Sequence, residues 1–555
     1  MTSSGGPGGC PSDQAPGEGH QTTTNLSAGE VIDPAFVELP LSRDPGETMH
    51  TEPVDPRPPV PAKPELRPLA KGPVLGIAGI VAVAHLAFSP LGGYWIDEVY
   101  LLAIGKYHLD WGYVDQPPLA PLIAAAMDWI APGYLPVLRL PAVLATAALV
   151  VLTALLAREF GGDRRAQVLA AGAGATGLWT AIVGHFVTPY VFEPALWLLL
   201  TWVLVRWIRL RAQGQGADRL LLLLGAVIGV TMQTKFQVAI LSVTLLICVL
   251  VFGPRDILRR PMFWGGMGIA ALIALPTLSW QAVNGWPQLK MGSIVADESD
   301  VWSGGRGSTA VTLLVFSGVA GTALLVVGLV RLLTARELRE YRFLAVAFLV
   351  LYAFFVATAG RPYYLIGLYG VLIAAGVVGF QLRREHRRPR WTWLAWPVYA
   401  ASFALAGYLL TLSPKIAPSS GMTAESAAAQ TSAAYAALPP DRQQHTAIIG
   451  ESYVMAAMIE VGDRHKTLPE VYSPHRGYGF FSPPTDEIDS VLYVGVHGEP
   501  TELRKYCTDL RKVSGSETPN PEPEGLTTPV KTEIWLCSGR QGSWAEIWPQ
   551  IKHLL

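Results

Sequence analysis

The sequence predicts a mainly helical protein that crosses a membrane many times and carries a small α/β domain at its C-terminal end. Half of the 555 residues are hydrophobic and only 15% are charged, whereas about a quarter of the residues are charged in a soluble globular protein. Apolar segments recur over residues 70–412, with lengths suited to a bilayer about 30 Å thick. The formal net charge of −1 gives no indication of a nucleic-acid partner.

Residues 1–69 are rich in Gly, Pro, Ser and Thr and show no apolar periodicity, so we expect a disordered tail. The criterion of about 20 apolar residues for one crossing then predicts about eleven transmembrane helices. They fall at roughly 72–91, 136–157, 167–183, 189–208, 220–234, 236–252, 262–280, 309–331, 343–359, 363–380 and 391–412.

The basic residues predict the orientation of these helices. Arginines cluster near residues 158–165, 206–219, 255–260, 331–342 and 383–390, in alternate loops, and are scarce in the others. Because Lys and Arg concentrate in cytoplasmic loops, we expect a multi-pass plasma-membrane protein with a cytoplasmic N-terminus. The first outer loop, residues 92–135, and the segment after residue 413 are then extracytoplasmic.

The first outer loop carries an unusual number of carboxylates for a segment between two apolar helices. The stretch GYWIDEVYLLAIGKYHLDWGYVDQPPL, residues 93–119, holds Asp97, Glu98, Asp110 and Asp115. A carboxylate in hydrocarbon costs about 2.5–3.5 kcal/mol or more, so these residues lie outside the lipid. Apolar residues from Ile96 to Ile104 suit a helix lying in the interface, and the two prolines before Leu119 suit the start of another.

Residues 413–555 predict a small extracytoplasmic α/β domain. Strand-like runs occur at TAIIG (446–450), SVLYVGV (490–496) and TEIWLCS (532–538), and YVMAAMIEVG (453–462) suits a helix. Cys507 and Cys537 both lie in this segment. They could form a disulfide if it faces an oxidising compartment, and the sequence leaves the pairing open.

With this orientation, ionisable and polar residues gather at the outer membrane face. They are Asp97, Glu98, Asp115, Gln116, Arg139, His185, Glu193, Lys235, Asp297, Glu298 and Arg361. Carboxylates can remove a proton, and cations can hold an anion. This arrangement suits a transferase whose sugar donor is a polyprenyl phosphate, because the leaving phosphate needs cations and the acceptor hydroxyl needs a base.

Four stretches, in this order, resemble one family. IDEVYLLAIGKYHLDWGYVDQPPL (96–119), RLP (139–141), TKF (234–236) and GRPYYLIGLYGVLIAAG (360–376) are similar to the bacterial glycosyltransferase family 39 group. LSWQAVNGWPQL (278–289) resembles a later outer loop of that group. Its relatives are the protein O-mannosyltransferases and the lipid A aminoarabinose transferases, which share the GT-C fold. The resemblance, over roughly residues 70–380, implies a GT-C domain over residues 70–412 that moves a sugar from a polyprenyl phosphate to an extracytoplasmic acceptor hydroxyl.

The resemblance also implies roles for single residues. Asp97 would be the general base toward the acceptor, with Glu98 completing the acidic pair. Relatives in the aminoarabinose branch have a lysine where this chain has Gln116, so other cations would hold the donor phosphate. The candidates for that role are Arg139, Lys235 and Arg361, with Tyr363 beside the last of them. Further pocket candidates are Asp115, Gln116, His185 and Glu193, of which Glu193 aligns loosely with an acidic residue at the start of the fourth span.

Plainer interpretations stay open for most of these residues. Asp115 could cap the helix that follows, Arg139 could anchor its span, and Arg361 with Tyr363 could lie in an aromatic interface belt. His185 suits a hydrogen-bonded interfacial histidine better than a metal ligand. No Cys/His cluster has zinc spacing, and no organic cofactor is indicated, although a carboxylate-rich loop could bind a divalent metal ion weakly.

The alternative function from another class is a lipid-linked sugar flippase or transporter. Transporters often show repeated halves and broken helices near the middle of the membrane, whereas the ionisable residues here gather at one face. The partners expected for the enzyme are membrane lipid, the polyprenyl-phosphate-linked sugar and a glycan, lipid or protein acceptor.

Overall fold

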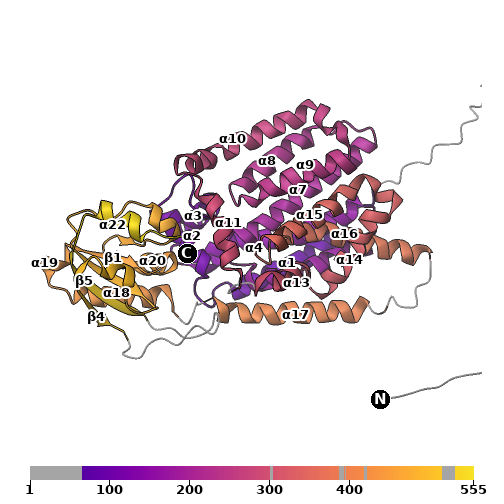
Figure 1. Ribbon diagram of the computed structural model, residues 1–555. Coiled ribbons are helices and arrows are strands. Elements are labelled where there is room, and N and C mark those ends of the chain that lie inside the picture. Colours follow the sequence, from indigo (N-terminus) through magenta and orange to yellow (C-terminus); the bar gives the residue numbers. More distant parts are fainter. Residues whose placement is uncertain are drawn as a thin grey trace, which may run out of the picture. The chain divides into compact units, whose positions relative to one another are not determined.

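The structure, a computed structural model, describes residues 66–300, 304–386, 393, 395–417, 422–515 and 532–554. The tail expected at residues 1–69 therefore lies almost wholly outside the described residues. The described chain is mainly helical and ends in a small sheet (Figure 1). A mainly helical protein with a small C-terminal sheet is thus confirmed.

Among the described residues, seven helices are long and apolar enough to cross a membrane, or eight if one bent pair is a single span. The seven are α1 (Lys71–Phe88), α4 (Leu135–Glu159), α7 (Pro189–Ala212), α10 (Pro261–Val283), α15 (Arg342–Ala357) with the preceding η2 (Arg336–Tyr341), α16 (Ile366–His386) and α17 (Ala395–Ile416). The bent pair is α13 (Gly305–Val315) and α14 (Val319–Thr334), which meet at 89°. The chain is a multi-pass membrane protein.

The remaining expected spans form shorter helices. These are α5 (Arg164–Gly174) with α6 (Leu178–Val183), α8 (Arg219–Met232) and α9 (Gln237–Phe252). At 1.5 Å per residue, a helix of 14 residues such as α8 is about 21 Å long, which is less than the hydrocarbon thickness of about 30 Å. The count of about eleven transmembrane helices is therefore not confirmed.

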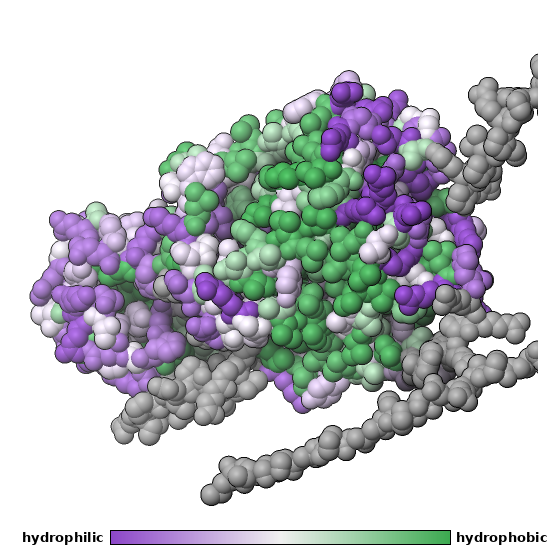
Figure 2. Space-filling view, turned by 45° about the vertical axis from the view of Figure 1, so that its right-hand side comes forward, coloured by the Kyte–Doolittle hydropathy of each residue, from purple (hydrophilic) through white to green (hydrophobic). Residues whose placement is uncertain are grey.

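The helices divide into a buried centre and an apolar periphery. α7 and α16 lie inside the bundle (Figure 1), and the apolar windows of both are mostly buried. α1 and α17 lie at the edge and expose apolar side chains such as Ile80, Val83 and Phe403. Figure 2 shows apolar surface over the helical bundle between two polar ends. An outer surface of this kind suits lipid, which offers no hydrogen bonds to polar groups.

The predicted arginine-rich loops meet at one polar end. Arg209 of α7 pairs with Glu159 of α4 at 2.6 Å, and Arg384 of α16 pairs with Asp163. Arg211 pairs at 2.6 Å with an aspartate of η1 (Arg255–Arg259). These ion pairs join the loops that follow α4, α7, α9 and α16. Which of the two polar ends faces the cytoplasm stays a prediction.

The C-terminal sheet has the strand order β2-β1-β3-β5-β4. Its strands are β1 (Thr446–Gly450), β2 (Val471–Tyr472), β3 (Ser490–Gly495), β4 (Cys507–Ser514) and β5 (Glu533–Arg540). β1 is parallel to β2 and β3, whereas β5 is antiparallel to β3 and β4. α18 (Ala424–Ala436) and α20 (Tyr453–Gly462) pack on one face, and α22 (Trp544–Ile551) packs on the other.

α20 connects this sheet to the membrane bundle. The apolar core beneath α20 continues into α2 (Ile96–Tyr107), the first helix of the outer loop, and includes Tyr100 and Ile448. α3 (Leu119–Ile130) follows in the same loop, and α11 (Pro287–Asp297) lies in a later one. The sheet therefore packs against the loop that carries the predicted catalytic carboxylates.

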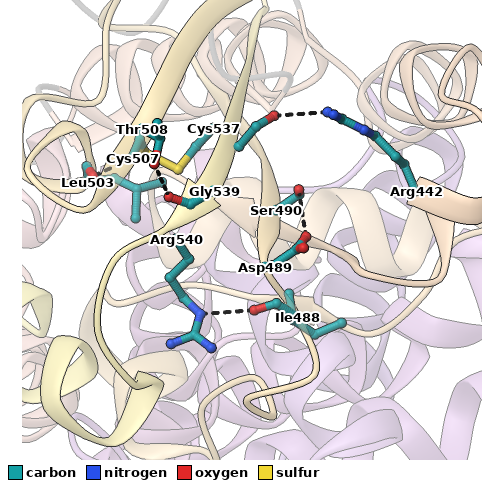
Figure 3. Close-up of a disulfide and its surroundings, with 11 residues drawn as sticks. Arg442, Ile488, Asp489, Ser490, Leu503, Cys507, Thr508, Cys537, Gly539 and Arg540 are labelled. Carbon is teal, nitrogen blue, oxygen red and sulfur yellow. Dashed lines mark hydrogen bonds between the residues drawn. A yellow bond between two sulfur atoms is a disulfide. The ribbon is translucent and has the colours of Figure 1, made fainter.

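Cys507 of β4 and Cys537 of β5 form a disulfide, with 5.4 Å between their Cα atoms (Figure 3). Beside it, the Thr508 hydroxyl donates to the Gly539 carbonyl at 2.7 Å. The bond links cysteines 30 residues apart, which in the chain-entropy model stabilises the fold by about 3.5 kcal/mol. The pairing that the sequence left open is therefore present across the outermost strand pair of the sheet.

Candidate active site

Asp97 and Glu98 are neighbours in the sequence but point to different sides of α2. Successive residues of an α-helix are rotated by about 100°, so the two carboxylates cannot share a face. The Glu98 side chain is 0% exposed, whereas Asp97 is only half-buried. The two residues that the resemblance treats as one acidic pair thus occupy different environments.

Glu98 and Arg139 form a buried ion pair, with 2.7 Å between Arg139 Nη2 and Glu98 Oε2. The Glu98 carboxylate also accepts from the Val187 backbone N–H at 2.9 Å. The remaining guanidinium N–H groups donate to backbone carbonyls, including those of Ser89 and Gly93. The pair holds α2, α4 and two loops together and leaves neither group free to contact a substrate. These contacts suit a structural role, and the catalytic role expected for Glu98 and the phosphate contact expected for Arg139 stay predictions.

Asp97 is held by a tyrosine from another helix. The hydroxyl of Tyr190, in the first turn of α7, donates to Asp97 Oδ2 at 2.9 Å. The Trp95 indole N–H donates to the same hydroxyl. Tyr190 packs against Tyr363, with ring centroids 4.8 Å apart, and Tyr363 stacks on Trp179 at 4.9 Å. Aromatic rings from three parts of the bundle therefore fix the position of the Asp97 carboxylate.

Lys235 lies between α8 and α9 and faces the same rings. Its ammonium is 6.0 Å from the ring centre of Tyr190, 5.1 Å from that of Tyr363 and 4.6 Å from that of Tyr364. Cation–π attraction favours this placement. Within the described part of the chain, the ammonium makes no hydrogen bond or ion pair, so its three N–H donors are available to an anion. Glu193, one turn after Tyr190, has a buried Oε1 that lacks a hydrogen-bond partner there.

Arg361 and Arg476 complete a group of charged residues around Asp97. We call this group the Asp97 cluster, and it also includes Lys235, Glu193 and Glu298. The Glu298 carboxylate, which directly follows α11, forms ion pairs with both Arg361 and Arg476. Arg476 begins η5 (Arg476–Phe480) in the C-terminal sheet region and lies over the ring of Tyr453 at 5.0 Å. Arg476 was missed in the sequence, because nothing in its local pattern separates it from other loop arginines. The structure places it shortly after β2, which is parallel to β1, and the carboxyl ends of parallel strands often carry binding residues.

The cations act on the Asp97 carboxyl. Burial raises its pKa above the ordinary value, and the hydrogen bond from Tyr190 opposes this rise. The positive charges of Arg476, Lys235 and Arg361 also lower this pKa, in that order. Three cations from three separate segments therefore lie close enough to act on one carboxylate.

Asp115 lies in the same electrostatic neighbourhood. Burial raises the pKa of its carboxyl to about 6, against the opposing charge of Arg476. The Tyr100 hydroxyl donates to Asp115 Oδ1 at 3.1 Å. Gln116, beside it, is buried, and its backbone carbonyl accepts from the Tyr113 N–H at 3.0 Å. The positive charge of Arg476 thus lowers the pKa of both Asp97 and Asp115 in the first outer loop.

His185 lies apart from this cluster. Its Nδ1 is 3.2 Å from His85 Nδ1, and its Nε2 is 3.2 Å from the Ser413 hydroxyl. The side chain is fully buried and links segments of α1 and α17. These contacts suit a packing role, and the pocket role expected for His185 stays a prediction. Among the described residues, no group of three or more His, Cys, Asp or Glu could hold a metal ion.

The membrane helices, the acidic outer loop and the sheet packed against it have the GT-C fold. Residues 115–280 match the family model for Dolichyl-phosphate-mannose-protein mannosyltransferase. The fold is similar to that of ArnT from Cupriavidus metallidurans. Its crystal structure in the apo state gives a TM-score of 0.57 at 12% identity, and the structure bound to undecaprenyl phosphate gives 0.53 at 13%. Each match covers 84% of this chain and 98% of ArnT.

An oligosaccharyltransferase from Archaeoglobus fulgidus, in complex with Zn and sulfate, is also similar, with a TM-score of 0.47 and 15% identity. That match covers 78% of this chain and 68% of the oligosaccharyltransferase. No curated protein matches the chain. The two ArnT structures show the GT-C fold, and the family-model match over residues 115–280 supports the resemblance to the glycosyltransferase family 39 group.

Proposed function

We propose that the protein is a membrane glycosyltransferase that moves one sugar from a polyprenyl phosphate to an extracytoplasmic acceptor hydroxyl. The observation that carries this proposal is the half-buried Asp97 carboxylate, which is bonded to the Tyr190 hydroxyl while the Lys235 ammonium faces the same tyrosine ring at 6.0 Å. A base and an anion site in one place are what this transfer needs. The description of the matching family model and the ArnT structure bound to undecaprenyl phosphate support a lipid-phosphate donor.

In the proposed reaction, Asp97 removes the proton of the acceptor hydroxyl. The hydroxyl oxygen forms a bond to the anomeric carbon while the bond from that carbon to the phosphate oxygen breaks. The polyprenyl phosphate leaves with the electron pair, and Lys235 and Arg361 stabilise its charge. A single displacement of this kind inverts the anomeric centre. Tyr190 positions Asp97 through its hydrogen bond.

Lys235 suits the phosphate role because its ammonium has aromatic contacts but no acidic partner at hydrogen-bond distance within the described chain. Burial lowers the pKa of Lys235, and the charges of Glu193 and Asp97 act in the opposite direction. A phosphate bound beside it would add negative charge and favour the protonated form. Tyr363 contributes its ring as a cation–π platform.

The proposed topology places the cytoplasmic tail at residues 1–69, the GT-C domain at 70–412 and the extracytoplasmic domain at 413–555. The disulfide between Cys507 and Cys537 supports this orientation, because disulfides persist in oxidising compartments. About eleven crossings of the plasma membrane follow if α5 with α6, α8, α9 and the bent α13–α14 pair each count as one.

The test is transfer of radiolabelled sugar from a polyprenyl phosphate to cell-envelope acceptors by the full chain in proteoliposomes. Asp97→Asn keeps the shape of the side chain but removes the base, so we expect transfer to fall by about 10²–10⁴-fold. The matched control is Asp110→Asn, an exposed aspartate of the same loop, which should keep its activity. A well-folded Asp97→Asn variant with full activity contradicts the proposal. So does wild-type label that crosses the bilayer without reaching an acceptor, which supports a flippase.

A further inference from the structure

We propose that the donor phosphate and the Glu298 carboxylate compete for the same two guanidinium groups, those of Arg361 and Arg476. This inference rests on the proposed function and adds Arg476, from the C-terminal domain, to the residues that hold the phosphate. It makes Glu298 an internal substitute for the substrate's anionic group. Binding of the lipid phosphate then breaks both ion pairs of Glu298.

The geometry of Glu298 is that of a bridging anion. One oxygen pairs with Arg361 and the other with Arg476. The side chains of Glu298, Arg361 and Arg476 are only 14%, 14% and 15% exposed. The two guanidinium groups come from the segment before α16 and from η5, so they converge from separate parts of the fold. Because guanidinium binds carboxylate and phosphate in the same forked geometry, a pair that holds one oxyanion suits the other.

The side chains of this cluster have more N–H donors than the Glu298 carboxylate accepts from. Arg361 Nη1 is buried and has no hydrogen-bond partner within the described residues. The Lys235 ammonium, which also acts on Asp97, makes no hydrogen bond or ion pair there. A buried donor without an acceptor costs about 1–3 kcal/mol. A phosphate group has more acceptor oxygens than a carboxylate, so it can occupy both arginines and also accept from these donors.

The position of Glu298 favours its exchange for another anion. It lies between the end of α11 and the helical residues Ser299 and Asp300, in a short acidic stretch. Asp297 and Asp300, both exposed, add further negative charge nearby. The two arginines offset this repulsion. Among the described residues, the Glu298 carboxylate bonds only to these two arginines, so a phosphate that takes them leaves the carboxylate without a described partner.

Arg476 is held in place by the domain that carries it. Its backbone lies in the left-handed region, with φ of 49°, which costs a non-glycine residue about 1–2 kcal/mol. Its N–H donates to the His553 carbonyl at 2.9 Å, and its Nε donates to the Leu554 carbonyl at 3.4 Å. Strained residues that the surroundings hold in this way cluster at functional sites. The backbone carbonyls of His553 and Leu554 therefore help to position one of the two guanidinium groups of the proposed anion site.

The experiment measures the affinity of the purified full chain in detergent for undecaprenyl phosphate. Glu298→Gln removes the competing charge, so we expect binding to tighten about tenfold, the effect of roughly 1.4 kcal/mol. The control is Asp110→Asn, which makes the same charge change at an exposed position of the first outer loop and should leave affinity unchanged. Arg476→Gln should weaken binding about 10- to 100-fold, and in that variant the effect of Glu298→Gln should shrink.

The outcomes separate this inference from the proposed function. If wild type binds undecaprenyl phosphate and Glu298→Gln binds it equally or more weakly, the competition is disproved while the transferase proposal stands. If wild type neither binds undecaprenyl phosphate nor transfers sugar, the proposed function itself fails. Should Arg476→Gln fail to fold, Arg476→Lys, which keeps the charge but loses the forked geometry, takes its place. Unchanged affinity in a folded Arg476→Lys variant also overturns the inference.

Discussion

Two charged clusters lie on different sides of α2 and differ in how completely their groups are paired. In the Glu98–Arg139 pair, guanidinium and carboxylate are fully buried and bonded to each other and to backbone groups. In the Asp97 cluster, Lys235 has only aromatic contacts within the described chain, and buried atoms of Arg361 and Glu193 lack partners there. The paired cluster stabilises the fold, whereas the incompletely paired one has capacity left for a ligand.

The energetics of the two clusters differ accordingly. Removing one partner of a buried ion pair costs about 3–5 kcal/mol, because the other charge stays buried without compensation. A buried polar atom without a partner costs about 1–3 kcal/mol while the protein is folded. Such groups are tolerated where a substrate satisfies them. A substitution should therefore affect stability at Glu98 and Arg139, and binding or rate at the Asp97 cluster.

The largest expected effect is that of Arg139→Ala. It leaves the Glu98 carboxylate buried without a counter-charge, so we expect a loss of about 3–5 kcal/mol in the free energy of unfolding. The measurement is thermal and denaturant unfolding of the full chain in detergent. The matched control is Arg206→Ala. Its partner Glu159 keeps a second arginine, Arg209, so that loss should be much smaller.

A double variant tests whether Glu98 and Arg139 stabilise the fold as a pair. Glu98→Gln together with Arg139→Gln removes both charges, so the pair should lose less stability than the sum of the single changes. A different outcome would reverse the comparison. If Arg139→Ala folds with normal stability and loses affinity for undecaprenyl phosphate, Arg139 holds phosphate and the pair is not structural.

Local patterns in the sequence predicted the elements well. The spacing of Ile96, Tyr100, Leu101 and Ile104 predicted an interfacial helix, and α2 covers these residues. The apolar runs at residues 446, 490 and 532 correspond to β1, β3 and β5. β4 was missed because it is an outer strand with mostly exposed or half-buried positions, including Asp509 and Arg511, so its composition resembles a loop. Alternation of apolar and polar residues marks a strand that buries one face, and β4 has no fully buried residue.

The sequence could not show which residues contact one another in the folded protein. Glu98 contacts Arg139 at a separation of 41 residues, and Arg476 reaches Glu298 across 178 residues. A single sequence shows which residues are ionisable but not which of them neutralise one another. In the sequence, Asp97 and Glu98 therefore appeared to have equivalent roles, and Arg139 appeared as available to a phosphate as Lys235. The fold separates them because α2 turns one carboxylate toward α4 and the other toward α7.

Lys235→Ala should have a smaller effect than Arg139→Ala, and it should change the kinetics of the reaction rather than the stability of the protein. The ammonium has no acidic partner at bonding distance in the described chain, so the unfolding free energy should change little. We expect kcat/KM for the polyprenyl-phosphate donor to fall about 10- to 100-fold, the usual range for losing a charged hydrogen bond. The control is Lys106→Ala, which removes an ammonium paired with Asp128 in the same outer region. A large loss of stability with normal donor kinetics would make Lys235 structural.

The smallest expected effect is a shift in pH dependence in Tyr190→Phe. Asp97 must be ionised to accept a proton, so activity should fall as the pH falls through its pKa, which burial holds above the ordinary aspartate value. The Tyr190 hydroxyl stabilises the ionised form and lowers this pKa. Removing it costs about 1.5 kcal/mol, which raises the midpoint of the acid limb by about one pH unit. Tyr363→Phe is the control, because it keeps the ring beneath Lys235 and no hydrogen bond joins Tyr363 to Asp97 in the described structure. A pH profile of kcat/KM that moves equally in both variants, or moves to lower pH in Tyr190→Phe, would show that Asp97 is not the base whose ionisation limits the reaction.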